Sequence, residues 1–357
     1  MDVFVRRMFA ESTDVDVHRT SRFCRIEMSD LRYDPVFDVW TVVAENRRDR
    51  PLEFVPNEQV RKPLICPFCA GNEDETPPPL ALHDSSGELI GNPSSADWTA
   101  RVFVNRYPTF TSDTHPGAPE AGPYRRMDGN GIQELVIPTP RHVSSLSELE
   151  LDELTAGLVA AQKRIVVVQQ NLGLVHAMLF CNCRFEAGAS IEHVHFQLIG
   201  SPLTSPAVDA RLDRMNEYQR VNHRSMLTDV VTFEKKEARR MIAETEHWTM
   251  FCPLASRMPF QVWIVPRKVS GPFSQVPIGV LGELAKLVRQ YVQRLEQLLG
   301  EPGYNWMLHQ PAFAKESHDN WFVEIVPRLA KTAGYELGAD IWVNPVSPET
   351  AARRLRQ

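Results

Sequence analysis

His193-Val194-His195-Phe196-Gln197 is the stretch around which the rest of the chain can be organised. Side chains alternate between the two faces of a β-strand, so the two histidines and Gln197 would project from one face of a strand over 192–199. Such a row can hold a phosphoryl group, because one imidazole can attack phosphorus while an amide donor stabilises the charge on the phosphate oxygens. Gln197 cannot activate water as a third histidine could, so the row favours transfer to a chosen acceptor over hydrolysis. The alternative is a histidine pair that binds a metal without catalysis, or that simply lies on a strand.

The residues before this stretch indicate the order strand, helix, strand, strand. Ser147 and Glu150 predict a capping box at the start of the helix, whose apolar residues recur at spacings of three and four. The expected elements are a strand over 135–137 that ends at Pro138, a helix over 151–168, and strands over 175–182 and 192–199.

The same order recurs further along the chain. The second set comprises a strand over 262–265, a helix over 278–299, and strands over 305–309 and 321–326. Pro266 lies 128 residues after Pro138, and Met307-Leu308 lies 129 residues after Met178-Leu179. By the offset of 129, the positions of His193, His195 and Gln197 correspond to Phe322, Glu324 and Val326. The pattern predicts an α+β fold of two tandem units, each an antiparallel sheet with a long helix, of which the second lacks the histidines.

Residues 77–123 interrupt this regularity. Pro, Gly, Ser and Asp dominate the segment, and apolar periodicity persists only around 101–105. It is predicted to be a loop-like insert or flap.

Cys66-Pro67-Phe68-Cys69 is a second motif with chemical content. Two thiolates at this spacing supply half of a tetrahedral zinc site. His142 and His193 could complete a Cys2His2 site and leave His195 as the nucleophile. Two unconnected core cysteines are the alternative.

Composition excludes several classes of function. The 357 residues carry a net charge of −6, so no general basic field exists to hold nucleic acid. The apolar runs are far shorter than the roughly 20 residues of a membrane span. The first 27 residues lack the apolar segment of a secretory signal, and the six cysteines have no extracellular context. A cytoplasmic protein with a loose N-terminal extension over 1–27 is expected.

Taken together, the motifs resemble the galactose-1-phosphate uridylyltransferase family, a branch of the histidine-triad superfamily. The resemblance runs from Leu31 to Arg356. The matching segments are Arg32-Tyr33-Asp34-Pro35, Asn46-Arg47-Arg48-Asp49-Arg50-Pro51, Cys66-Pro67-Phe68-Cys69, Val102-Phe103-Val104-Asn105, Pro140-Arg141-His142, Asn182 to Gln197, Glu324 to Arg328, Ala333-Gly334-Tyr335-Glu336 and Asn344-Pro345. It implies a catalytic histidine-triad-like unit over 28–205 and a second such unit, on the sugar-phosphate side, over 206–357.

The resemblance also implies roles for individual residues. His195 would carry the nucleotide and Gln197 would assist it, while a structural zinc would be bound by Cys66, Cys69, His142 and His193. The implied nucleotide-site residues are Arg47, Arg50, Asn105, Asn182, Gly188 and Ser190, and those for the hexose are Lys331 and Glu336. The implied reaction is a ping-pong exchange between a nucleoside-diphosphate sugar and a sugar 1-phosphate, in a homodimer.

Several positions depart from the family pattern. Glu192 and Val194 replace prolines, Phe196 replaces a small residue, and Arg106 stands where an aspartate is common. Phe322 replaces a histidine, which makes a second metal near His309 and Glu324 doubtful.

Three functions follow from these observations. A UDP-glucose–hexose-1-phosphate uridylyltransferase is the leading hypothesis. The alternative is a phosphorylase that uses inorganic phosphate to split ADP-glucose or a dinucleoside polyphosphate. A non-catalytic, nucleotide-binding zinc protein is the third.

Overall fold

The computed structural model describes residues 30–34, 39–43, 65–91, 98–111, 123–171, 173–268, 271–313 and 321–357. The expected extension over 1–27 and the site candidates Arg47 and Arg50 lie outside these residues.

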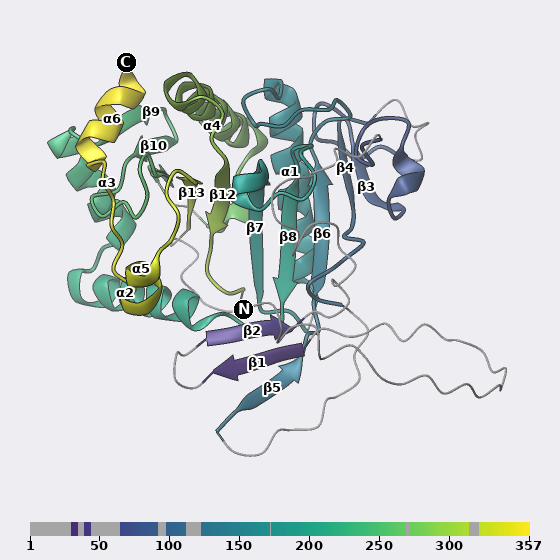
Figure 1. Cartoon of the computed structure of the whole chain (residues 1–357), viewed down its shortest axis with the longest axis horizontal. Coiled ribbons are helices and arrows are strands. Elements are labelled where there is room, and N and C mark those ends of the chain that lie inside the picture. Colours follow the sequence, from purple (N-terminus) through teal and green to yellow (C-terminus); the bar gives the residue numbers. More distant parts are fainter. Residues whose placement is uncertain are drawn as a thin grey trace, which may run out of the picture.

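A ten-stranded antiparallel sheet forms the body of the described chain (Figure 1). Its strands, in spatial order, are β3 (Pro79–His83), β4 (Ala100–Val104), β6 (Ile132–Ile137), β8 (Phe196–Ser201), β7 (His176–Cys183), β12 (Tyr304–His309), β13 (Phe322–Pro327), β11 (Val262–Pro266), β10 (Trp248–Phe251) and β9 (Met241–Glu244). A separate three-stranded sheet contains β2 (Val39–Val43), β1 (Asp30–Asp34) and β5 (Arg125–Asp128). The fold is therefore a mixture of helices with a large antiparallel sheet.

Two long helices, α1 (Leu151–Gln169) and α4 (Ile278–Leu299), pack on the same core of the large sheet and against each other. Alternate residues of the central strands enter this core, among them Leu179 and Cys181 of β7 and Trp306 of β12. Helix α1 approaches β6 closely, because a Cβ atom on Gly157 would lie 2.7 Å from the Cβ of Pro138. The intervening residues of the same strands, such as Asn182 and Asn305, are only half-buried. We call the face that they line the open face of the sheet.

Four further helices complete the described chain: α2 (Pro206–Asn222), α3 (Met226–Glu237), α5 (Gly334–Ala339) and α6 (Pro348–Arg356). Leu227 and Val231 of α3 and Met215 of α2 form a second core with Phe251 and Phe322. No helix within the described residues combines the length and the apolar character that crossing a membrane requires.

The expected helices agree closely with α1 and α4, whereas three local predictions were wrong. First, β8 begins at Phe196 rather than at Glu192, because the backbone N–H of Val194 donates to Val143 O, 2.8 Å away, outside the ladder. Second, Ser147 does not cap α1. Its hydroxyl donates to Glu296 Oε2 at 2.6 Å, and the N-cap residue is Glu150.

Third, the segment over 77–123 is not devoid of regular structure. It contains β3 as well as β4, and the two strands pair with each other. Leu82 of β3 packs against a small core of Phe68, Trp98 and Phe103, which anchors this edge of the sheet. The many Pro and Gly residues of this segment led to a loop prediction where the five-residue strand β3 forms.

A buried polar network joins the segment that precedes α1 to the second half of the sheet. The hydroxyl of Tyr304, which is fully buried, accepts a hydrogen bond from Leu146 N at 2.9 Å and lies 3.0 Å from Ser145 Oγ. Ser145 in turn donates to Glu296 Oε1 of α4 at 2.7 Å. Replacing Tyr304 by a residue without the hydroxyl would therefore leave the backbone N–H of Leu146 without an acceptor.

We expect Tyr304→Phe to lower the free energy of unfolding by roughly 1–3 kcal/mol, the usual cost of an unsatisfied buried donor. Urea unfolding followed by circular dichroism measures this difference. Tyr335→Phe, at a residue that is 57% exposed, is the matched control and should behave as wild type. Equal stability of the two variants would contradict the role of the network.

Candidate active site

Four predicted metal ligands come together from three separate segments. Cys66 and Cys69 belong to a turn before β3, His142 follows β6, and His193 precedes β8. The Nδ1 atom of His193 lies 3.5 Å from the sulfur of Cys66 and 3.6 Å from that of Cys69, and His142 Nδ1 lies 3.5 Å from Cys69 Sγ. All four ligand atoms lie within 4.8 Å of one another, so this group could hold a metal ion.

The protonation state of His193 suits a metal ligand. Its Nε2–H donates to Thr139 O at 3.1 Å, so the lone pair remains on Nδ1, which faces the sulfurs. Burial lowers the pKa of His193 to about 4, which keeps the ring neutral. Burial, together with the neighbouring Cys66, raises the pKa of Cys69 to about 11. The two sulfur atoms lie within 4.8 Å of each other, so both thiols would ionise near neutral pH only with a cation beside them.

Helix α1 holds the segment that carries Thr139 and His142. The carboxylate of Glu153, in the first turn of α1, accepts hydrogen bonds from Thr139 Oγ1 at 2.5 Å and from Arg141 Nε at 2.9 Å. The backbone of Ala70, beside Cys69, donates to Pro140 O at 3.1 Å. The two segments that carry the potential metal ligands are thus fixed to each other and to the helix.

His195 is oriented by the backbone of His193. Its Nδ1–H donates to His193 O at 2.8 Å, so the proton resides on Nδ1 and the lone pair on Nε2. The ring of Phe68 meets it edge-on, with centroids 5.2 Å apart, and the whole residue is only 5% exposed. An unprotonated ring nitrogen in a fixed position is the requirement for a nucleophile at phosphorus.

Two amide side chains lie next to His195, one further along its own strand and one across from it on β7. Gln197 is two residues further along the chain, and Asn182 is one position beyond the paired residues Cys181 and Phe196. The oxygen of each amide accepts a hydrogen bond from another amide: Gln197 from Gln133 at 2.9 Å and Asn182 from Asn305 at 2.8 Å. Gly188, with a φ of 91°, lies close to Asn182, whose Nδ2 would be 3.7 Å from a Cβ at that position.

The remaining predicted site residues are less closely gathered. Asn105 closes a turn by accepting the N–H of Tyr107 at 3.0 Å, and Ser190 lies half-buried before β8. Glu336 accepts the N–H of Ala333 at 3.1 Å at the start of α5, and Lys331 is exposed. Figure 1 shows α5, which contains Glu336, well apart from β8, which His195 directly precedes.

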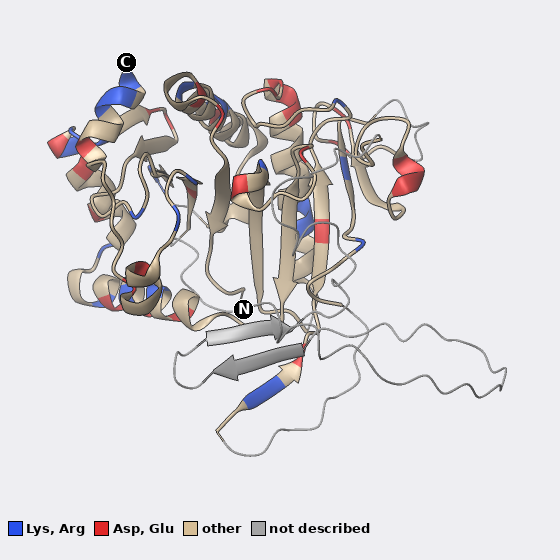
Figure 2. Ribbon diagram, viewed as in Figure 1, with Lys and Arg blue, Asp and Glu red and all other residues tan. Residues whose placement is uncertain are grey.

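The strands nearest His195 contain no Lys or Arg, and the one acidic residue of β6, Glu134, pairs with Arg164 of α1. Figure 2 shows β7, β8 and β12 without a coloured residue, and their sequences contain no Lys, Arg, Asp or Glu. The amides of Asn182, Gln197 and Asn305 are the polar groups of these strands that lie closest to His195 along the ladder.

Gln133, Asn305 and Thr139 are site residues that the sequence analysis missed. Each acts on a predicted site residue through a hydrogen bond across the sheet or between loops. The only signal for Gln133 was a polar residue at the start of the apolar strand Ile132–Ile137.

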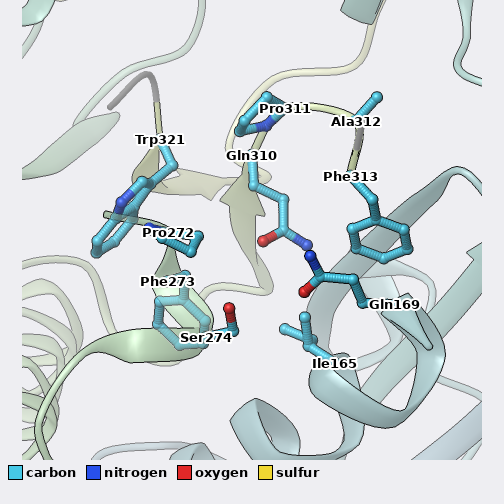
Figure 3. A pocket seen from close by; sticks show the side chains of 10 residues that line it. All are labelled: Ile165, Gln169, Pro272, Phe273, Ser274, Gln310, Pro311, Ala312, Phe313 and Trp321. Atoms are coloured by element: carbon cyan, nitrogen blue, oxygen red, sulfur yellow. The ribbon is translucent and has the colours of Figure 1, made fainter. Parts of the chain in front are cut away.

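A hollow lies between α1 and the segment that follows β12 (Figure 3). It is at the opposite end of the strands from His195, because β12 starts beside Cys183 and ends beside Leu179. Ile165, Phe273 and Phe313 contribute apolar walls, and the amide of Gln310 is engaged with Ala177 O at 2.8 Å. Its lining contains no titratable side chain, so we assign it no chemistry.

The two residues of the doubtful second metal position, His309 and Glu324, bind each other and other protein groups. Glu324, which is 2% exposed, accepts hydrogen bonds from Trp263 Nε1 at 3.0 Å, His309 Nε2 at 2.8 Å and Arg257 Nη2 at 3.1 Å. Burial alone would raise its pKa, but the hydrogen bond and charge of His309 and the charge of Arg257 lower the pKa of Glu324 to about 2. Among the described residues, His309 and Glu324 have no third His, Cys, Asp or Glu close enough to complete a metal site.

We expect Glu324→Gln to destabilise the fold by about 1–3 kcal/mol at pH 7, because an ionised acceptor of several donors is lost. The folded carboxyl ionises near pH 2, whereas the unfolded one ionises near 4.5, so its contribution is complete above pH 4.5 and disappears as the pH falls toward 2. The difference in unfolding free energy between wild type and variant, measured in urea, should therefore be smaller at pH 3.5 than at pH 7. A pH-independent difference would refute this assignment. Glu301→Gln, at a side chain that is 81% exposed, is the control.

Comparison with known proteins gives a consistent picture. The chain matches no model of a protein family. It is 32% identical over 338 residues to the ADP-glucose phosphorylase of Arabidopsis thaliana, covering 92% of both chains. It is 26% identical over 341 residues to the galactose-1-phosphate uridylyltransferase of Thermotoga maritima, covering 92% of this chain and 98% of that protein.

Solved structures agree with the sequence relatives. A crystal structure of an ADP-glucose phosphorylase from Arabidopsis thaliana with bound ADP-glucose superimposes with a TM-score of 0.69 at 28% identity, covering 92% of this chain and 98% of that chain. A uridylyltransferase mutant superimposes with a TM-score of 0.74 at 24% identity, covering 92% and 96%, and so shares the fold. The resemblance inferred from the motifs is confirmed: the protein belongs to the galactose-1-phosphate uridylyltransferase family of nucleotidyl-transferring enzymes.

Proposed function

We propose that the protein transfers a nucleoside monophosphate from a nucleoside-diphosphate sugar to an acceptor through a covalent intermediate on His195. The observation that carries the proposal is the 2.8 Å hydrogen bond from His195 Nδ1–H to the carbonyl of His193, which directs the lone pair to Nε2. In the first step, Nε2 forms a bond to the α-phosphorus while the bond from phosphorus to the bridging oxygen breaks, and sugar 1-phosphate leaves. In the second, an acceptor phosphate oxygen attacks the same phosphorus and releases the imidazole.

His193 also accounts for the stability of that intermediate. An imidazole that is substituted at Nε2 and protonated at Nδ1 carries a positive charge, and a carbonyl oxygen on Nδ1–H stabilises it. Gln197 supplies an amide donor for the charge on the phosphate oxygens. Arg47, Arg50, Asn105, Asn182, Gly188 and Ser190 are proposed to bind the nucleotide, and Lys331 and Glu336 the sugar.

Two acceptors remain candidates, and the comparisons favour inorganic phosphate. The 32% identical relative is an ADP-glucose phosphorylase, and a 28% identical structure contains ADP-glucose. ADP-glucose and phosphate are therefore the first substrates to test. A hexose-1-phosphate uridylyltransferase is the second candidate, supported by the 26% identical relative.

We further propose that zinc occupies the cluster of Cys66, Cys69, His142 and His193. The donor set of two thiolates and two neutral imidazoles fits tetrahedral zinc with no position left open for substrate. When bound, zinc would supply a structural cross-link and neutralise the thiolates. The consequence for catalysis is indirect, because His193 carries the carbonyl that orients His195.

The tandem arrangement and the assembly are also proposals. From each edge of the large sheet toward its centre, the strands run β6-β8-β7 on one side and β11-β13-β12 on the other. In both sets the first strand along the chain lies outermost, the third lies next to it and the second lies at the centre. This shared order supports two copies of one unit over 28–205 and 206–357. Exposed apolar side chains on and after α5 support a homodimer; they are Tyr335, Leu337, Ile341 and Val343. A cytoplasmic location remains a prediction.

Intact-protein mass spectrometry after mixing with ADP-glucose or UDP-glucose tests the proposed intermediate. We expect an acid-labile nucleotidyl adduct in wild type, no adduct in His195→Ala, and a normal adduct in the control Cys252→Ala. Adding inorganic phosphate or galactose 1-phosphate should remove the adduct and so identify the acceptor. A wild-type protein that binds both nucleotide sugars without forming an adduct would establish the non-catalytic alternative.

Metal analysis by atomic emission tests the zinc site. Purified protein should contain about one zinc per chain, because four preorganised ligands bind the ion tightly. Cys66→Ser/Cys69→Ser should lose the zinc and melt at a lower temperature, whereas Cys252→Ala should retain it. Zinc retained in the double variant would show that the ion binds elsewhere.

A further inference from the structure

The orientation of the two amides beside His195 is determined by the residues behind them. A ligand-facing Gln or Asn can present either its NH2 group or its oxygen, and the two choices have opposite consequences for a phosphate. An NH2 group donates to phosphate oxygens, whereas an amide oxygen repels them. The inner partners of Gln197 and Asn182 therefore bear on how a phosphate is received.

The first chain of hydrogen bonds begins at the backbone of Thr109. Its N–H, which can only donate, points at Gln133 Oε1 from 2.7 Å. Gln133 must then present its NH2 group to Gln197, and it donates to Gln197 Oε1 at 2.9 Å. Both glutamines are more than nine-tenths buried, at 2% and 8% exposure, so neither can turn freely. The NH2 group of Gln197 is left to point away from Gln133.

The second chain begins at a carbonyl, with the same outcome. Ala187 O, which can only accept, receives Asn305 Nδ2–H at 2.9 Å. The same NH2 group donates to Asn182 Oδ1 at 2.8 Å. Asn182 therefore also turns its oxygen inward, and its NH2 group lies beside Gly188. This series of hydrogen bonds crosses from β12 to β7, the two strands that meet at the centre of the sheet.

We infer that Gln133 and Asn305 are positioning residues that set the amides of Gln197 and Asn182 to present NH2 donors to the phosphoryl group at His195. The inference rests on the proposed nucleotidyl transfer. It also explains how strands without Lys or Arg can receive a phosphate, since two oriented amides supply the donors (Figure 2). Within the described part of the chain, both amides use their oxygen atoms toward the protein, which leaves the NH2 groups for a ligand.

Gln133→Glu tests the first chain, because it keeps size and shape but reverses one hydrogen bond. The carboxylate can still accept from Thr109 N–H, yet it cannot donate to Gln197, whose amide must rotate and turn its oxygen toward the phosphate. At pH 8.5 we expect the rate of adduct formation to fall about 100-fold, as when one oxyanion donor is removed. Gln133→Met, which leaves the Gln197 amide free to adopt either orientation, should lose less than about tenfold.

A double-mutant cycle separates positioning from a purely structural effect. Once Gln197 is replaced by Met, Gln133→Glu should cause no further loss of rate, because it acts only through the missing amide. Melting temperature and zinc content, measured for every variant, show whether the fold persists. If the losses add independently, or if Gln133→Met is slower than Gln133→Glu, the first chain has no positioning role.

Asn305→Asp is the corresponding change in the second series of hydrogen bonds, and it also removes the hydrogen bond that Asn305 donates to Ala187 O. Its carboxylate would force Asn182 to donate inward and so turn its oxygen toward the nucleotide. We expect a loss of about tenfold or more that becomes smaller in the Asn182→Ala background, because the part that acts through Asn182 disappears there. A loss of the same size in both backgrounds would overturn the assignment. The proposed function fails separately, if wild type forms no adduct with either nucleotide sugar. An adduct in wild type with unchanged rates in Gln133→Glu and Asn305→Asp would refute the positioning role alone.

Discussion

Two carbonyl oxygens, those of Thr139 and His193, each accept a hydrogen bond from an imidazole N–H, and the site depends on this pair. The first bond commits His193 to bind through Nδ1, facing the thiols of Cys66 and Cys69. The second leaves Nε2 of His195 as the nitrogen that would react in the proposed transfer. Because the carbonyl of one histidine orients the ring of the other, a metal ion bound to His193 would also fix the proposed nucleophile. Two residues of the same type, two positions apart, thereby take different chemical roles.

Both halves of the chain hold residues of the site in place. Glu153 in the first turn of α1 binds Thr139 and Arg141, so the helix that covers the core also fixes the loop that carries His142. Across the sheet, Asn305 reaches from β12 to Asn182 on β7. The half of the chain without the histidine pair thus contributes to the site at the strand junction. That contribution gives a physical reason for the two halves to share one continuous sheet rather than to form separate domains.

The sequence predicted the parts of this structure that follow from periodicity and from motif residues. Helices α1 and α4 and the central strands have regular apolar spacing, and Cys66, Cys69, His142 and His193 are chemically distinctive. The start of β8 was misplaced, because Val194 pairs with the segment at Val143, a contact that no local pattern reports. Gln133, Thr139 and Asn305 were missed for the same reason. Their roles arise from hydrogen bonds between residues 54 to 123 positions apart in the chain.

The central claim is that Nε2 of His195, and no other atom, becomes bonded to phosphorus. Nuclear magnetic resonance on protein labelled with 15N-histidine, mixed with the nucleotide sugar in the absence of acceptor, tests this directly. The account predicts a single 15N–31P coupling, at an Nε2 atom whose ring carries its proton on Nδ1, and the loss of that signal in His195→Ala. A coupling at Nδ1, or one that survives in His195→Ala, would contradict the assignment of the nucleophile.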